Sequence, residues 1–213
     1  MTESANGIIL RTRLLTETSL IVNWLTPEHG RISTVAKGAR RQKSPFRGKL
    51  DLFYEADFSF QRSRRSELHT LREIVLRDTH IALRSNLGYL QQASYCAALI
   101  EQTTERDTPL RGIFELLREF LDTLPLHPPQ SRNIFAFELK LLNELGLNPD
   151  LDKSNLTAAT KALVSELLAG DWPNISELKA TTAQAKELRR FLHGFLSLHL
   201  GKIPKQRNAA IGS

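Results

Sequence analysis

The sequence predicts an α+β protein, with a five-stranded antiparallel OB-fold β-barrel at the N-terminus followed by an all-α helical domain. Apolar residues alternate with a period of two over about the first 80 residues and recur at helical spacing after that. Five short strands in so few residues favour closure into a small barrel, because closure removes exposed sheet edges. We therefore expect an OB-fold domain at residues 1–80 and a helical domain at residues 81–213, with an SH3-like barrel as the alternative for the first.

Five segments of the first domain have the composition of β-strands, and a turn at Pro27–Gly30 joins the second and third as a hairpin. The predicted strands are Gly7–Leu14, Ser19–Thr26, Arg31–Lys37, Leu52–Gln61 and Leu68–Leu76. Most of their aromatic residues are expected to fill the barrel, and stacking on bases stays open for Trp24, Phe53, Tyr54, Phe58 and Phe60. Phe53 and Tyr54 lie on opposite faces of the fourth strand, so one of them is expected to face outward.

The rest of the chain shows the 3.6-residue period of amphipathic helices. Pro109 stands near one helix start and Gly146 at one helix end, where each residue type is favoured. The single cysteine, Cys96, is expected to be a buried small hydrophobe, and it excludes an internal disulfide. The predicted helices are Ile81–Thr104, Pro109–Leu124, Ser131–Leu145, Thr157–Ala169 and Thr181–Leu200.

Basic residues are concentrated at the two ends of the chain, which has a net charge of +6 and a pI near 9.7. The segment Arg31–Lys49 contains seven basic residues and no acidic one. Side chains of like charge repel one another unless an anion neutralises them, so this cluster predicts contacts with phosphates. The predicted contacts are Arg31, Lys37, Arg40, Arg41, Lys43, Arg47 and Lys49, extended by Arg62, Arg64 and Arg65 in a second basic turn.

No pattern in the sequence favours catalysis, a metal or a cofactor. Gly38–Ser44 departs from a nucleotide-binding P-loop because Gln42 stands where a glycine must precede the lysine. His193 and His199 are too far apart to ligate a metal from one helix face, and no cysteine accompanies them. No apolar run suits a signal peptide or a membrane span, so we expect a cytoplasmic protein without a membrane partner.

The AKGAR core and its ETS and TPEHGR neighbours are specific as a set, and further motifs follow in order along nearly the whole chain. The motif residues are Gly7–Arg13, Glu17–Leu20, Thr26–Arg31, Ala36–Arg41, Ser44, Phe46–Leu50, Phe137–Leu142, Leu145–Gly146 and His199–Lys202. Together they resemble RecO, a family of bacterial recombination mediators.

The resemblance implies an OB-fold and a helical domain that bind single- and double-stranded DNA and anneal complementary strands. It implies partnership with RecR and with the single-stranded-DNA-binding protein SSB, to help load RecA, with RecF as an indirect partner and the nucleoid as the site of action. Many family members carry a four-cysteine zinc module, and the corresponding stretch here, Asn148–Thr157, has no cysteine. A structural zinc is therefore not expected.

Two further surfaces are candidates for contacts with a partner. The acidic, hydrophobic C-terminal tail of SSB suits an apolar groove rimmed by cations, and Arg132 and Lys140 on the predicted helix Ser131–Leu145 are candidates for that rim. The basic C-terminal tail, with Lys202, Lys205 and Arg207, is expected either to contact DNA or to be solvated. Competing functions are an RNA-binding OB-fold protein and a non-catalytic adaptor for an acidic protein.

Overall fold

The computed structural model describes residues 2–212, and its internal contacts divide the chain into two compact units. The first unit comprises the residues up to Ile81 together with Thr104–Arg118. The second comprises Ala82–Thr103 and the residues from Glu119 onward. The segment Thr104–Arg118, which was expected in the helical domain, thus groups with the barrel. The domain boundary near residue 80 stays a prediction.

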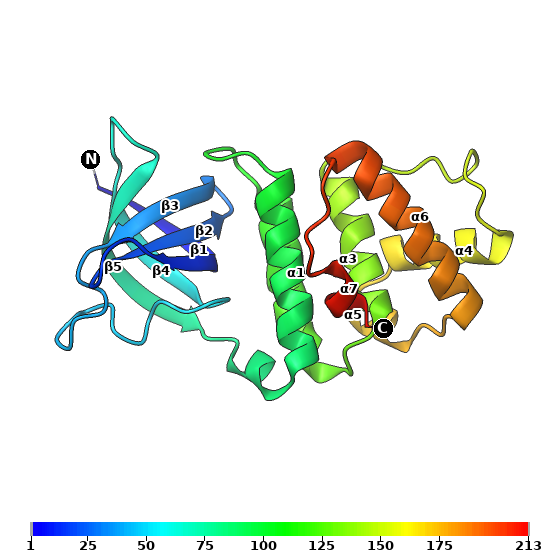
Figure 1. The fold of residues 1–213 in the computed structure, drawn as a ribbon, viewed down its shortest axis with the longest axis horizontal. Coiled ribbons are helices and arrows are strands. Elements are labelled where there is room, and N and C mark those ends of the chain that lie inside the picture. The colour runs from blue at the N-terminus through cyan, green and yellow to red at the C-terminus, as the bar shows by residue number, and fades with distance from the viewer. Residues whose placement is uncertain (1, 213) are drawn as a thin grey trace. The chain divides into compact units, whose positions relative to one another are not determined.

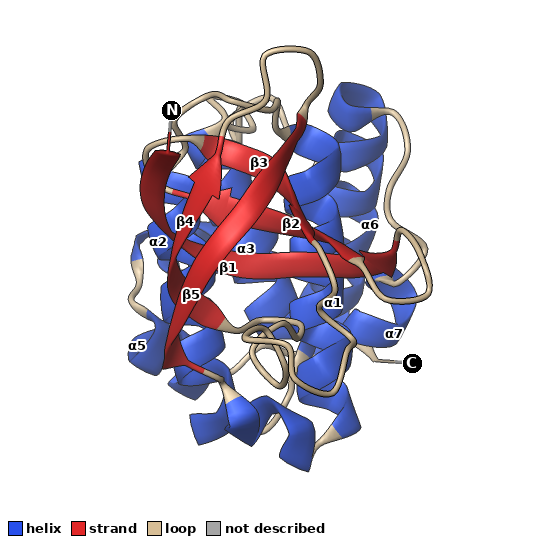
Figure 2. Ribbon diagram, turned by 90° about the vertical axis from the view of Figure 1, so that its left-hand side faces the viewer, coloured by secondary structure: helices blue, strands red, loops and turns tan. Residues whose placement is uncertain are grey.

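The first unit contains a closed barrel of five strands in the order β1-β2-β3-β5-β4 (Figures 1 and 2). Its strands are β1 (Thr2–Leu14), β2 (Leu20–Thr26), β3 (Gly30–Ala36), β4 (Glu55–Gln61) and β5 (Leu68–Asp78). The predicted five-stranded OB-fold barrel is confirmed. All pairings are antiparallel except β3 with β5, which run parallel over Ser33–Val35 and Leu68–Thr70. A closed ring of five strands cannot alternate in direction throughout, so one parallel pair is required.

Two strands, β1 and β4, begin more than one residue away from their predicted starts. β1 starts at Thr2 rather than Gly7, because its polar first half pairs with β4 and only its second half pairs with β2. β4 starts at Glu55 rather than Leu52, because Phe53 has a φ of 67°, which is incompatible with a strand. The prediction that Phe53 and Tyr54 alternate on a strand is therefore wrong: Phe53 is buried, and the half-buried Tyr54 packs against the core.

Aromatic side chains fill the barrel. Trp24 stacks on Phe58 with 4.0 Å between ring centroids, and the Trp24 indole N–H donates to Thr34 Oγ1 at 2.9 Å. Phe60 stacks on His69 at 5.4 Å. Trp24, Phe53, Phe58 and Phe60 are all buried, so these four rings belong to the core and are not exposed to stack on bases.

The turn into β3 depends on a glycine in close contact with Thr108. Gly30 has a φ of +60°, and a Cβ there would lie 1.7 Å from the carbonyl oxygen of Thr108. We expect Gly30→Ala to destabilise the protein by at least about 2 kcal/mol. The left-handed backbone costs roughly 1–2 kcal/mol in a residue with a Cβ, and the clash with Thr108 adds to this cost. Gly48→Ala is the matched control, since Gly48 has a φ of +73° but open space around it. Urea unfolding of both variants checks this, and equal shifts of the midpoint would contradict it.

The second unit is helical and is organised around α3, which contacts α1, α4, α5, α6 and α7 (Figure 1). The helices of the two units are α1 (Leu87–Thr103), α2 (Arg111–Thr123), α3 (Ser131–Glu144), α4 (Ala158–Ala169), α5 (Trp172–Glu177), α6 (Thr182–Leu200) and α7 (Arg207–Ile211), with 3-10 turns at Ile81–Ser85 and Leu124–Leu126. The first part of α2, up to Arg118, belongs to the first unit. The five predicted helical segments are present, and the first is divided into a 3-10 turn and α1. The short helices α5 and α7 were not predicted. Within residues 2–212, no helix combines the length and apolar character needed to cross a lipid bilayer.

A buried ion pair ties α7 to α3. The Arg207 guanidinium donates to both carboxylate oxygens of Glu138, at 2.6 and 2.8 Å, and the Tyr95 hydroxyl donates to the same carboxylate. Burial opposes the charge of Arg207, but Glu138 holds the pKa of Arg207 above its ordinary value; burial, and then Glu138, raises the pKa of Tyr95. The prediction that Arg207 is solvated or contacts DNA is therefore wrong. Cys96 is buried, as predicted.

Candidate nucleic-acid interface

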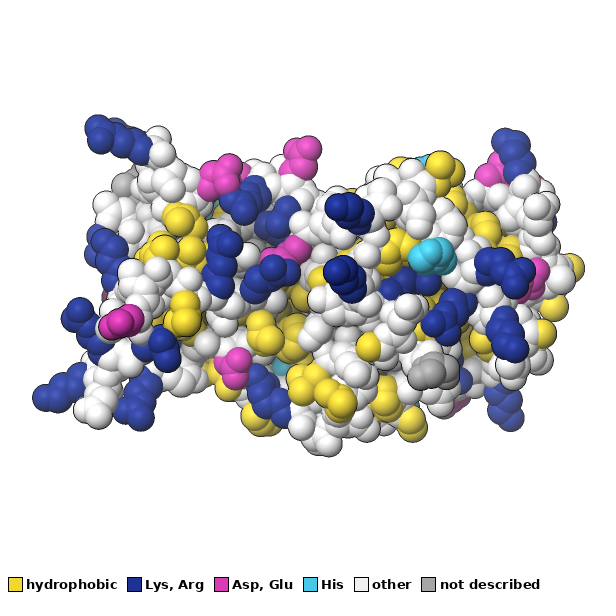
Figure 3. All heavy atoms as spheres, in the orientation of Figure 1, with side chains coloured by type: hydrophobic (Ala, Val, Ile, Leu, Met, Phe, Trp, Pro, Cys, Tyr) yellow, Lys and Arg dark blue, Asp and Glu magenta, His cyan; other side chains and the backbone are white. Residues whose placement is uncertain are grey.

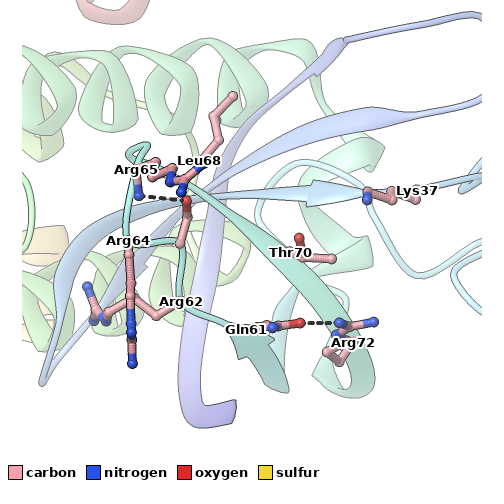
Figure 4. A pocket seen from close by; sticks show the side chains of 9 residues that line it. Lys37, Gln61, Arg62, Arg64, Arg65, Leu68, Thr70 and Arg72 are labelled. Carbon is pink, nitrogen blue, oxygen red and sulfur yellow. Dashed lines mark hydrogen bonds between the residues drawn. The ribbon is translucent and has the colours of Figure 1, made fainter. Parts of the chain in front are cut away.

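The barrel carries a basic hollow of about 590 Å³ between the end of β3, the end of β4, the β4–β5 loop and β5 (Figure 4). All of its lining residues lie within residues 2–212, and none of them is acidic. Lys37 lies across the hollow from Arg64 and Arg65, and the Arg72 guanidinium donates to the Gln61 side chain. The five cations that line the hollow are Lys37, Arg62, Arg64, Arg65 and Arg72.

The alternation of β5 explains how Arg72 reaches this surface. His69 and Leu71 point into the barrel and are buried, so Leu68, Thr70 and Arg72 share the outer face. Arg72 does not stand out in a count of charges along the chain, because the acidic residue Glu73 follows it directly. Extending the period-two pattern from Leu68 would have found it.

The basic loop between β3 and β4 presents its cations to solvent. Phe46 and Ala39 are buried and anchor the loop, while the backbone N–H of Arg40 donates to Thr18 O at 3.0 Å. None of the loop's exposed cations forms an ion pair with a carboxylate of residues 2–212. In Figure 3, Lys and Arg side chains outnumber Asp and Glu over the visible face of the barrel. The exposed loop cations are Lys37, Arg40, Arg41, Lys43 and Arg47.

Three of the predicted phosphate contacts are half-buried and have partners inside the protein, whereas Arg40 and Arg47 are exposed although they donate to Glu17 O and Gln42 O at 3.0 and 3.3 Å. Arg31 Nε donates to Thr104 Oγ1 at 2.8 Å, and the half-buried Lys49 ammonium lies 3.4 Å from Ile74 O. Arg62 bonds Glu3 at 2.8 Å and Asp107 at 2.8 Å. These hydrogen bonds, first with Glu3 and then with Asp107, raise the pKa of Arg62, and the bond from Arg62 lowers the pKa of Glu3. The role of these three residues in DNA binding stays a prediction.

Arg132 and Lys140 on α3 are engaged with the ends of other helices. The Arg132 guanidinium donates to the carbonyl oxygens of Ser176 and Leu178 at the end of α5, and Lys140 donates to Leu168 O near the end of α4 at 2.8 Å. Cations are favoured at helix C-termini, where carbonyls are left unpaired. Burial lowers the pKa of both side chains. Their contact with the SSB tail stays a prediction, and the geometry gives both a structural task.

Together the strand order and the hollow define the class of this protein. A five-stranded Greek-key barrel whose ligand surface is formed by its strands and the β4–β5 loop is an OB-fold, and this one is lined by cations. The surface therefore suits a polyanion.

The chain belongs to the recombination protein O (RecO) family. Residues 1–80 match the model described as "Recombination protein O N terminal", and residues 84–157 and 153–208 match "Recombination protein O C terminal". The resemblance found in the sequence motifs is confirmed.

Curated relatives named "DNA repair protein RecO" agree with this membership. The chain is 34% identical to the Anaeromyxobacter sp. (strain K) protein over 146 residues, which is 68% of this chain and 58% of the relative. It is 34% identical to the Rhodopirellula baltica protein over 143 residues, covering 67% and 53%. The match to the Alkaliphilus metalliredigens protein is 27% over 231 aligned residues, covering 92% and 93%. The chain thus spans less than two thirds of the first of these relatives.

Proposed function

We propose that this protein is a DNA repair and recombination mediator that binds single- and double-stranded DNA without catalysing a reaction. Its barrel would hold phosphates with the exposed cations of the β3–β4 loop and of the hollow. Family membership supports the repair role, and the relatives carry the name of a DNA repair protein. The single observation that carries the DNA contact is the hollow, which is lined by five cations and no carboxylate.

The buried aromatic rings support strand annealing as the outcome of this binding. Proteins that stack bases on exposed aromatic side chains keep those bases from pairing. Trp24, Phe53, Phe58 and Phe60 are buried here, so cations would hold the backbone while the bases remain free. Neutralising two strands lowers their repulsion and lets complementary bases meet.

Partnership with RecR and with the SSB tail, and help in loading RecA on SSB-coated DNA, belong to the same proposal. They are supported by family membership alone. The proposed place of action is the nucleoid in the cytoplasm.

Annealing of complementary oligonucleotides, bare and coated with SSB, tests the proposal. The Arg40→Ala/Arg41→Ala variant is expected to anneal more slowly and to show a log–log salt slope for single-stranded DNA about 1.4 smaller, because each lost phosphate contact removes roughly 0.7. Arg77→Ala is the control, since Arg77 is exposed on β5 but pairs with Asp57 at 2.7 Å. Absence of annealing by the unaltered protein, or tighter binding to matched RNA than to DNA, would overturn the proposal.

A further inference from the structure

The connection between α1 and α2, Thr104–Leu110, lies along the start of β3 and is called the strap here. The Asp107 N–H donates to Arg31 O and the Leu110 N–H donates to Pro27 O, each at 3.2 Å. The Arg31 side chain donates a hydrogen bond to Thr104 Oγ1. Arg31 and Arg106 form a parallel β-bridge. The strap is therefore fixed on the barrel by backbone bonds at several points and can serve as a support for other parts of the first unit.

Both ends of the β4–β5 loop are bound to this strap. At the start of the loop, Arg62 Nη1 donates to Asp107 Oδ1 at 2.8 Å. At its end, Glu67 accepts from the Arg106 guanidinium. Arg62 also makes a two-pronged contact with Glu3 of β1, at 2.8 and 3.1 Å.

A buried histidine completes the attachment from the barrel side. His69 is 3% exposed, and its Nδ1 accepts a hydrogen bond from the Ser63 N–H at 3.4 Å. Arg62 Nη1 lies 3.5 Å from the other ring nitrogen. The Ser63 hydroxyl in turn accepts from the Arg65 N–H at 3.3 Å. The bonds thus lead from the strap through Arg62 and Ser63 to the residues at the loop tip.

The charges divide the loop into two kinds of cation. Arg62 already has two carboxylates, and a phosphate brought to it would be repelled by both. Arg64 and Arg65 are exposed, and neither forms an ion pair with a carboxylate of residues 2–212. The charge at the start of the β4–β5 loop is therefore neutralised by carboxylates, whereas the tip of the loop is positively charged.

We propose that Arg62 is a positioning residue, which fixes the β4–β5 loop to Glu3 and to Asp107 of the strap so that Arg64 and Arg65 are held at the hollow to meet phosphates. This inference rests on the proposed DNA binding and deepens it. It separates Arg62 from the phosphate contacts and gives Glu3, Asp107, Arg106 and Glu67 a part in DNA binding without touching DNA.

Salt titrations of single-stranded DNA binding separate a positioning residue from a phosphate contact. Arg62→Ala is expected to weaken binding roughly tenfold, because the DNA complex would then have to order the loop. Its log–log salt slope should equal that of the unaltered protein. Arg64→Ala/Arg65→Ala should weaken binding and also lower the slope by about 1.4.

Asp107→Ala gives the sharpest contrast and also serves if Arg62→Ala does not fold. If Arg62 contacted phosphate, removing Asp107 would release it, so that affinity and slope would rise. A positioning role predicts lower affinity at constant slope. The double variant Arg62→Ala/Asp107→Ala should then bind no more weakly than Arg62→Ala alone, because both substitutions break the same support.

Limited trypsin digestion without DNA provides a second readout. Arg62→Ala and Asp107→Ala should both speed cleavage after Arg64 and Arg65, since a released loop is cut faster.

The outcomes distinguish DNA binding at the hollow from the positioning role of Arg62. If Arg64→Ala/Arg65→Ala binds DNA like the unaltered protein with the same slope, DNA binding at the hollow is refuted. If that variant behaves as expected but Arg62→Ala also lowers the slope, or Asp107→Ala binds more tightly, the positioning role alone is refuted.

Discussion

Replacing Lys37, Arg64, Arg65 and Arg72 together with alanine is expected to lower the log–log salt slope of single-stranded DNA binding by about 2.8, because each phosphate contact contributes roughly 0.7. These side chains line one hollow that holds no carboxylate. Between 50 and 200 mM salt, the unaltered protein should therefore lose roughly 50-fold more affinity than the variant. Fluorescence anisotropy with a labelled oligonucleotide measures both slopes.

A control with the same loss of charge removes the trivial explanation that net charge alone matters. Arg77, Arg111, Arg118 and Lys153 are cations that each pair with a carboxylate: Asp57, Glu28, Glu115 and Asp150. Their joint replacement by alanine leaves the hollow intact, so its slope should stay close to that of the unaltered protein. Equal slopes for the two quadruple variants would mean that the hollow holds no DNA.

The second large effect is expected on stability. Glu138→Ala should destabilise the protein by about 3–5 kcal/mol, because it leaves a buried guanidinium without its counter-charge. Glu138 is 0% exposed and Arg207 4% exposed, so water cannot replace the lost partner without local unfolding. Urea unfolding followed by circular dichroism gives the change in the free energy of unfolding.

A double variant shows whether the loss comes from the stranded charge. Glu138→Leu/Arg207→Met replaces the pair with apolar side chains, and such replacements are often neutral or stabilising. We expect it to be more stable than Glu138→Ala, although the Tyr95 hydroxyl would lose its acceptor. A double variant as unstable as the single one would show that packing around α3 matters more than the charge.

The fold was predictable where the signal is local. The period-two pattern and the hairpin turn placed all five strands, and the 3.6-residue period placed the five longer helices. The first half of β1 is polar, and it pairs with β4 from Thr2↔Gln61 to Ile8↔Glu55, so its partners lie far away along the chain. Similarly, α7 is a short segment whose position depends on Glu138 of α3. A single sequence contains no local signal for either contact.

The candidate site was predictable as a charge cluster but not as a geometry. The exposed cations of the β3–β4 loop and the pair Arg64 and Arg65 follow from counting charges along the chain. Counting cannot tell that Arg62 faces Glu3 and Asp107, because those carboxylates come from distant segments. It also passes over Arg72, whose position at the hollow depends on the strand face.

The bidentate contact between Arg207 and Glu138 limits how the C-terminus can be engineered. Removing the last seven residues would delete Arg207 and leave the buried Glu138 carboxylate without its counter-charge. The expected loss of stability is about 3–5 kcal/mol, as for any buried ion pair that loses one partner. A shortened protein for biophysical work should therefore either retain α7 or carry an apolar residue in place of Glu138.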